Sequence, residues 1–214
     1  MSNPAAQPPH SNRRYYASRV KESLTGRATK CICSFFLTLL LIGAVVAFVL
    51  WLSLRPHRPR FHIEQFSIPG IKQDGGFQNT VITFNLTIRN PNQNIGIFYD
   101  QMEAQVYYRE TLFGVTALGP PFYQGPKNTT VVASRINGTP LPGDNPVWQM
   151  VLADRFTGTV VFRLDITAEV RSKVAAIYNG RRDHTMHVDC QVEVGPDGVI
   201  LPRSVDRRCP VYFY

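Results

Sequence analysis

The stretch TVVFRLDITAEVR, residues 159–171, alternates apolar and polar side chains along its whole length. This period of two is typical of a β-strand that turns one face to a core and the other to water. The outward positions include charges of both signs, such as Arg163 and Asp165. The inward positions are all apolar: Val160, Phe162, Leu164, Ile166, Ala168 and Val170. The stretch therefore predicts a long strand in a sheet with one solvated face.

The same alternation recurs on both sides of this stretch. It is clear in VITFNLTIR, residues 81–89, and in MHVDCQVEV, residues 186–194. Gly- and Pro-rich turns separate further strand candidates, which are residues 61–68, 97–108, 129–136 and 209–213. One segment breaks the pattern, NPVWQMVLAD at residues 145–154, where Asn145 suits a helix N-cap and Pro146 the first helical position. About seven strands and one short helix predict an all-β fold, an antiparallel β-sandwich over residues 61–214.

An uncharged hydrophobic segment, residues 31–54, precedes this domain. As a helix it would be about 36 Å long, enough to cross a bilayer core of about 30 Å. It is longer than the apolar core of a cleaved signal peptide and lies further from the N-terminus, so it predicts an uncleaved signal anchor. Residues 1–30 are too polar to fold alone and predict a disordered cytoplasmic tail, and residues 55–60 form a basic juxtamembrane linker.

The net charge of +8 is unevenly distributed. Residues 1–60 hold nine Lys/Arg and one acid, whereas residues 61–214 hold fourteen of each sign. A neutral domain has no excess of basic surface with which to neutralise phosphates, so we expect no nucleic-acid partner. More basic residues flank the span before it than after it, which favours a cytoplasmic N-terminus and a C-terminal domain outside the cell.

Modification sites and cysteines agree with this orientation. The acceptor sequons at Asn85, Asn128 and Asn137 all follow the span, and alternation places Asn85 on the wet face of its strand. Cys190 and Cys209 also follow it and are expected to form a disulfide, the alternative being two buried free thiols.

Two pairs of small residues in or beside the span allow two interpretations each. Cys31 and Cys33, at its cytoplasmic edge, are either palmitoylated or simply small residues that fill a helix end. Gly43 and Ala47 have the small-xxx-small spacing that lets transmembrane helices dimerise, although apolar helices contain such pairs often.

Catalytic and cofactor motifs are missing from the sequence. There is no phosphate loop, no zinc-type cysteine pairing and no Gly-x-Ser-x-Gly elbow. His184 and His187 have a helical metal-site spacing, but in a strand they fall on opposite faces. We therefore expect no enzyme activity, no cofactor and no metal.

The triplet Asn90-Pro91-Asn92 interrupts the strand pattern in TIRNPNQNIGIFYD, residues 87–100. Pro91 cannot donate a ladder hydrogen bond, and asparagine side chains can bond their own backbone. The triplet therefore predicts a structural corner between two strands. A binding role for the triplet, or for the loop PPFYQGPKNTT at residues 120–130, is the alternative.

Two blocks of this region, NPNQNIGIFYD at residues 90–100 and GPPFYQGPKNTTVV at residues 119–132, resemble signatures of the plant NHL family, the harpin-induced-like and non-race-specific-disease-resistance-like proteins. In the third family block this chain has Arg171 and Lys173, but its Gly180 is displaced. The residues that carry the first two blocks are Asn90, Pro91, Asn92, Tyr99, Asp100, Pro121, Phe122, Gln124 and Gly125. The resemblance implies a late embryogenesis abundant type 2 domain with an immunoglobulin/fibronectin III-like Greek-key sandwich, and a plasma-membrane location facing the wall.

The resemblance also implies a role in pathogen response or abiotic stress. Together with the span and the neutral outer domain, it predicts a non-catalytic, membrane-anchored interaction module with a protein partner at the plasma membrane or cell wall. The alternative is a late-embryogenesis-type factor that protects the lipid bilayer itself.

Overall fold

The computed structural model describes residues 24–53, 57–174, 178–179 and 184–213. The chain divides into two compact units, Met1–Val49 and Leu50–Tyr214. Helix α1, Leu24–Ser53, is apolar and long enough over Gly26–Leu52 to cross a membrane. It begins within the segment predicted as disordered tail, because residues such as Arg27, Ala28 and Lys30 are good helix formers that extend a helix once it is started. The rest of the predicted tail, residues 1–23, the last residue of the predicted span, residue 54, and linker residues 55–56 lie outside the described residues.

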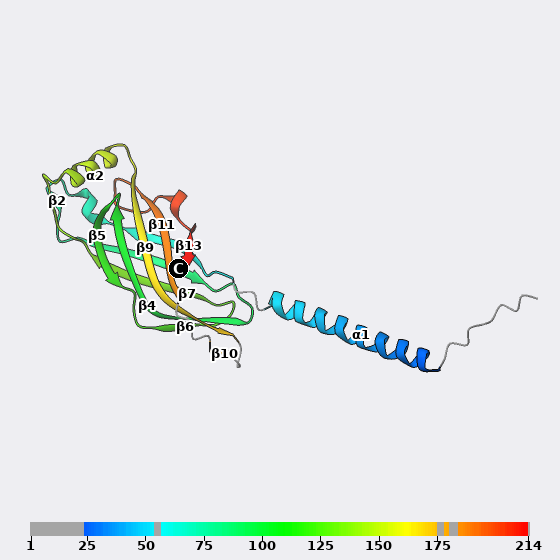
Figure 1. Cartoon of the computed structure of the whole chain (residues 1–214). Helices are drawn as coiled ribbons and strands as arrows, with labels where there is room; N and C mark the ends of the chain where they lie inside the picture. Colours follow the sequence, from blue (N-terminus) through cyan, green and yellow to red (C-terminus); the bar gives the residue numbers. More distant parts are fainter. Residues whose placement is uncertain (1–23, 54–56, 175–177, 180–183, 214) are drawn as a thin grey trace, which may run out of the picture. The chain divides into compact units, whose positions relative to one another are not determined.

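The second unit is built on two antiparallel sheets (Figure 1). The four-stranded sheet has the order β12-β1-β3-β7, with bounds Arg207–Cys209, Arg60–Ser67, Val81–Arg89 and Thr129–Asn137. The larger sheet has the order β13-β11-β9-β4-β5, with bounds Val211–Phe213, His184–Val194, Val160–Val174, Ile95–Tyr108 and Thr111–Ala117. Strands β6, Phe122–Gln124, and β10, Tyr178–Asn179, pair with β4 and β9, and β2, Gly76–Phe77, pairs with β8, Leu141–Pro142.

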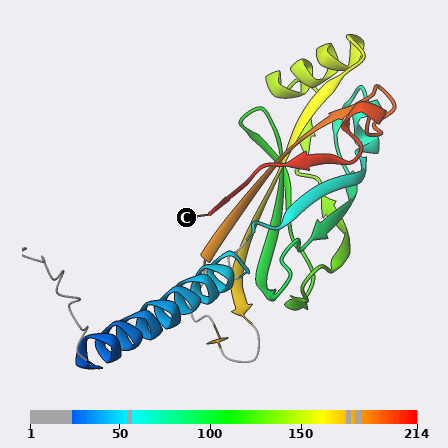
Figure 2. The same ribbon diagram turned by 90° about the vertical axis from the view of Figure 1, so that its right-hand side faces the viewer.

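A single apolar core lies between the two sheets, which overlie one another in Figure 1 and lie side by side in Figure 2. All six inward residues predicted for the 159–171 stretch are buried. The ring centroids of Phe66, from β1, and Phe162, from β9, lie 6.2 Å apart across the core. The predicted β-sandwich is thus confirmed at the level of a mostly antiparallel-sheet domain.

Helix α2, Pro146–Phe156, confirms the predicted helical segment. The Asn145 side chain accepts a 2.8 Å hydrogen bond from the Val147 amide, which is the predicted N-cap. Trp148 on this helix is fully buried and packs against Phe77 with ring centroids 5.8 Å apart. Figure 1 shows this helix at the end of the sandwich opposite β6 and β10.

Two strand predictions need correction. Residues 111–117 form β5, which the sequence pattern missed because Gly114 interrupts the alternation; Gly114 lies so close to β7 that a Cβ would meet the Ile136 side chain at 2.4 Å. Residues 209–213 were predicted as one strand but divide between the two sheets, since β12 ends at Cys209 and β13 begins at Val211. Pro210 stands between them and cannot donate a ladder hydrogen bond.

The predicted disulfide between Cys190 and Cys209 is present, with a Cα–Cα distance of 4.8 Å. Cys190 belongs to β11 of the large sheet and Cys209 to β12 of the four-stranded sheet. The bond therefore links the two sheets directly, at a point where both cysteines are buried.

We expect the Cys190→Ala/Cys209→Ala variant to lose roughly 3 kcal/mol of unfolding free energy, because the bond closes a loop of 19 residues in sequence. Denaturant unfolding of the full chain in detergent, followed by near-UV circular dichroism, measures this loss. Cys31→Ser/Cys33→Ser is the matched control and should leave the transition unchanged. Equal transitions for the two double variants would contradict a stabilising role for the bond.

Candidate functional site

The side chain of Asn90 is fully buried where the chain passes from β3 to β4. Its Nδ2 donates to the carbonyl oxygens of Ile95, at 2.8 Å, and Gly125, at 3.0 Å. Its Oδ1 accepts from the backbone and side-chain nitrogens of Asn92, at 3.0 and 2.9 Å. One amide thus joins the end of β3, the start of β4 and the loop after β6. We call this arrangement the Asn90 corner.

Asn92 extends the corner to His57, which lies within the predicted linker at residues 55–60. Its Nδ2 donates to the His57 carbonyl at 2.8 Å, and its Oδ1 accepts from the His57 amide at 2.6 Å. The Asn92 side chain therefore replaces a strand partner for the backbone of His57. Beyond it, the Arg58 side chain donates to the Val211 carbonyl at 2.8 Å, so the chain is docked onto the domain from His57 onward.

Gln124 connects the second family block to the same corner. It is fully buried, and its Nε2 donates to the Ile88 carbonyl at 2.7 Å and to Thr130 Oγ1 at 3.1 Å. The Tyr99 hydroxyl donates to Gln124 Oε1 at 3.4 Å, and burial raises the pKa of Tyr99 above its ordinary range. The Tyr99 and Phe122 rings stack with centroids 4.8 Å apart.

The remaining family-block residues are closer to the surface. Asp100 accepts two hydrogen bonds of 2.5 Å from Arg171, and these bonds lower the pKa of its carboxyl. Gly125 contributes its carbonyl to the corner, Pro91 is half-buried, and Pro121 is exposed. Most of the two blocks is therefore occupied in holding the fold together, as the corner interpretation predicts.

One row of side chains from these blocks faces outward across the large sheet. Tyr123, Phe98 and Arg171 are register partners on β6, β4 and β9. The Phe98 and Tyr123 ring centroids lie 4.6 Å apart, and the Lys173 ammonium is 5.9 Å from the centre of the Tyr123 ring. Gly96 makes room for Tyr123, since a Cβ there would lie 2.1 Å from the Tyr123 hydroxyl oxygen. We call this the aromatic row; Tyr123 itself is 47% exposed.

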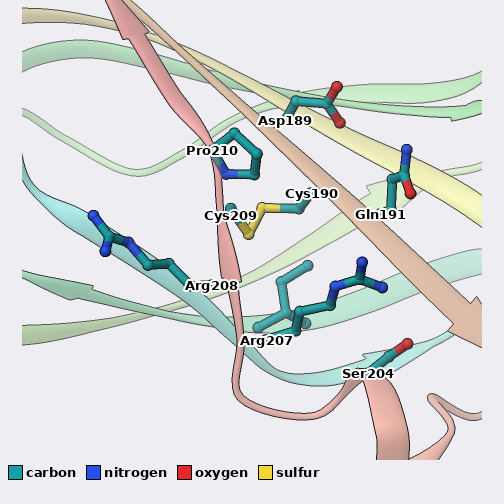
Figure 3. Close-up of a pocket in the computed structure, with 9 residues that line it drawn as sticks. Asp189, Cys190, Gln191, Ser204, Arg207, Arg208, Cys209 and Pro210 are labelled. Atoms are coloured by element: carbon teal, nitrogen blue, oxygen red, sulfur yellow. A yellow bond between two sulfur atoms is a disulfide. The ribbon is translucent and has the colours of Figure 1, made fainter.

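Two cavities lie near these features. One, of about 280 Å³, is bounded by the docked segment at residues 57–59, by Ile95 and Ile97 of β4 and by Phe213. The other, of about 210 Å³, lies over the disulfide, and Figure 3 shows Arg207 and Arg208 on either side of Cys209. Ser204 in its wall accepts a hydrogen bond from the Glu193 amide at 3.2 Å and has no histidine partner among the described residues. Neither cavity presents a nucleophile paired with a base.

The other predicted sites are dispersed. Asn85 lies on β3, Asn128 directly precedes β7 and Asn137 ends β7, so all three sequons belong to the four-stranded sheet. Cys31 and Cys33 are free and exposed on α1, and a Cβ at Gly43 would meet no atom within 4 Å beyond its chain neighbours and the backbone of its own helix.

No group of three metal-ligating side chains occurs in the described part of the chain. His187 points outward, with its Nδ1 3.3 Å from Thr167 Oγ1, and His184 lies exposed at the start of β11. The displaced Gly180 of the third block lies outside the described residues.

Two features of the site escaped the sequence analysis. One is the docking of His57 on Asn92, which joins residues 35 apart in sequence. The other is the contact of Tyr123 with Gly96. The docking of His57 left no signal in the sequence. The contact of Tyr123 was signalled only by Gly96, because an isolated glycine in a strand indicates the close approach of another group.

This buried asparagine corner on a disulfide-linked β-sandwich is the structural context of the two family blocks. The sequence profile of the "Late embryogenesis abundant protein" family matches residues 85–191. The chain is 30% identical to Protein NDR1 of Arabidopsis thaliana, over 83% of this chain and 81% of that protein. It is 33% identical to NDR1/HIN1-like protein 10 of the same plant, over 67% of this chain and 66% of the relative. The chain belongs to the late embryogenesis abundant type 2 family, among its NDR1/HIN1-like members.

Two further matches cover less of the relative or share less sequence identity. NDR1/HIN1-like protein 3 of Arabidopsis thaliana is 34% identical over 68% of this chain, which spans only 58% of that relative. Among solved structures, that of a putative late embryogenesis abundant protein matches with a TM-score of 0.34 and 16% identity, over 88% of this chain and 96% of that chain.

We expect Asn92→Ala to lower the unfolding free energy by about 1–3 kcal/mol, because it removes two hydrogen bonds to the backbone of His57, each with a net contribution of about 0.5–1.5 kcal/mol. Hydrogen exchange should detect the loss locally, as reduced protection of the His57 amide. Gln93→Ala is the control, because Gln93 is exposed next to the same corner. Unchanged exchange at His57 in Asn92→Ala would show that the docking does not depend on this side chain.

Two aspartates should affect the pH dependence of stability in opposite directions. The pKa of Asp100 is lowered by its hydrogen bonds from Arg171, so its ionised form stabilises the fold above the ordinary pKa of 3.8, and this stabilisation is lost as the pH falls through the lowered folded value. The pKa of Asp165 is raised, chiefly by burial, although Arg163 lies 3.2 Å away. Ionised Asp165 therefore opposes folding at neutral pH.

We accordingly expect Asp100→Asn to lower the melting temperature at pH 7, with a cost of about 1 kcal/mol or less because the ion pair is exposed. Asp165→Asn should leave the melting temperature at pH 7 equal or higher. Thermal melts between pH 3 and 7 provide the comparison. The Asp100→Asn deficit should shrink toward the acid end, and a deficit independent of pH would contradict the ion-pair explanation.

Proposed function

We propose that this protein is a non-catalytic, single-pass plasma-membrane protein that displays its β-sandwich outside the cell as an interaction module in plant defence and stress signalling. The observation that carries the proposal is a self-contained domain, with its own core and disulfide, that follows a membrane-length apolar helix. The family, which is related to plant defence and stress, supports the biological setting. Family members are not known as enzymes.

The strand order supports a Greek-key arrangement of immunoglobulin-like type. After β3 the chain crosses to the large sheet for β4, β5 and β6, and then returns to pair β7 with the free edge of β3. A returning strand of this kind is the defining element of a Greek key.

Sequon placement supports both the orientation and the choice of binding face. Asn85 and Asn137 have outward parity on β3 and β7, and Asn128 is exposed at the start of β7. Glycans at these positions would cover the four-stranded sheet and its β7 edge, which would otherwise be open to pairing with another chain. The outer face of the large sheet, with the aromatic row, is then the surface left for a protein partner at the membrane or wall.

The alternative, a factor that protects the bilayer itself, is favoured by one observation. The domain is docked from His57 onward and is therefore tied closely to the lipid surface. This function predicts that vesicles carrying the protein leak less after drying and rehydration than empty vesicles do. Equal leakage would remove it.

The proposed topology is tested by glycosidase and protease treatment of plant protoplasts that express the full chain. We expect glycosidase to increase gel mobility, and each of Asn85→Gln, Asn128→Gln and Asn137→Gln to remove the contribution of its own occupied sequon. External protease should digest the domain while epitopes near the N-terminus survive. A domain that stays intact and unglycosylated would place it on the cytoplasmic side.

The interaction role is tested by crosslinking in intact membranes before and after elicitation. We expect a discrete protein adduct that Tyr123→Ala reduces, because Tyr123 is the most prominent exposed ring of the aromatic row. Val131→Ala is the matched control, because Val131 is 60% exposed on the outer side of β7 in the four-stranded sheet. Equal adducts from the two variants would argue against the large sheet as the binding face.

A further inference from the structure

Basic side chains gather at one end of the β-domain. Arg60 begins β1 and Arg89 ends β3, and the two are direct cross-strand partners with exposed side chains. Lys127 is exposed in the loop between β6 and β7, and its backbone amide donates to the Asn92 carbonyl at 3.0 Å. Lys173 lies near the end of β9, beside the aromatic row. We call Arg60, Arg89, Lys127 and Lys173 the basic end.

These charges have little internal compensation. Arg60, Arg89 and Lys127 make no ion pair with any described residue. Asp100, the acid beside the aromatic row, is already bonded to Arg171. Like charges directly opposite each other on paired strands are destabilising. Residues 61–214 hold equal numbers of acidic and basic residues, and Arg60, just before them, adds a positive charge directly opposite Arg89. The arrangement becomes favourable when an anionic surface is present.

The chain length limits which anionic surface is always within reach. Only residues 54–56 separate Ser53, the last residue of α1, from His57, which is bonded to Asn92 at the basic end. Four residue steps span at most about 14 Å. Whatever orientation the domain takes, His57 therefore stays within that distance of the end of the helix, and the basic end lies on the same side of the domain as His57. If α1 spans the membrane, the lipid head groups lie within this range.

We propose that the basic end docks on anionic phospholipid head groups of the leaflet at which α1 ends. The inference rests on the proposed membrane anchoring and goes beyond it, because it assigns the domain a lipid-facing surface. Helix α2, at the opposite end of the sandwich (Figure 1), then faces away from the lipid.

The test measures the distance between the domain and the lipid head groups. The full chain, made without glycans so that Asn128 beside Lys127 is bare, is placed in nanodiscs in a Cys31→Ser/Cys33→Ser background. A donor dye is attached at Thr129→Cys, next to Arg89 in register, and acceptor dyes at the head groups. We expect energy transfer to increase when phosphatidylglycerol is added to phosphatidylcholine, and to fall again at high salt, which screens exposed charges.

Charge reversal identifies the surface that docks. Each basic residue near an anionic membrane contributes about a fivefold effect, so Arg60→Glu/Arg89→Glu should lower the docked-to-free ratio by at least about 25-fold. Lys72→Glu/Arg135→Glu makes the same change in net charge away from the basic end and should retain docking. Equal melting temperatures for the two variants exclude misfolding as the cause of any difference. Equal loss of docking in both variants, or transfer that is insensitive to lipid charge, overturns the proposal.

Two further measurements separate competing explanations. If soluble polygalacturonate binds the protein in neutral discs through Arg60 and Arg89, while lipid charge has no effect, the basic end is a polysaccharide site and the proposal is wrong. Alkaline extraction of membranes tests the anchoring itself. Release of the chain would refute the proposed function, whereas a retained chain without docking would refute only this inference.

Discussion

The structure depends on satisfying buried backbone groups at the point where the chain leaves one sheet for the other. A buried carbonyl or amide without a partner costs about 1–3 kcal/mol, and the Asn90 corner supplies side-chain amides in place of strand partners. Asn90 serves the carbonyls of Ile95 and Gly125, and Gln124 serves that of Ile88. Without the Asn90 side chain, no side-chain amide would bond both the start of β4 and the loop after β6.

The same corner connects fold to function through Asn92. By bonding both backbone groups of His57, it fixes the point at which the membrane linker meets the domain. The family blocks are therefore used mainly for architecture, and the surfaces available for recognition are those around them. The aromatic row on the large sheet and the basic end beside the linker both border the corner, so their positions relative to the linker follow from it.

The distribution of charge shows why a neutral total is a poor guide to the behaviour of this domain. Fourteen residues of each sign cancel over residues 61–214. Arg60, just before this range, nevertheless lies opposite Arg89, while the nearby Asp100 is ion-paired with Arg171. A surface of one sign can therefore attract an anionic partner locally even though the charges of residues 61–214 sum to zero.

The sequence by itself determined the long strands, the helix at Asn145 and the inward set from Val160 to Val170, because a period of two or a capping residue is a local property of the chain. It also favoured a disulfide between Cys190 and Cys209, because both follow the predicted span and Cys190 falls on the inward positions of its alternating strand. Only the tertiary structure decided that Cys190 and Cys209 join different sheets, that β5 exists despite Gly114, and that His57 rests on Asn92. These features depend on which strands become neighbours, and pairings between residues far apart in the chain leave no periodic pattern in the sequence.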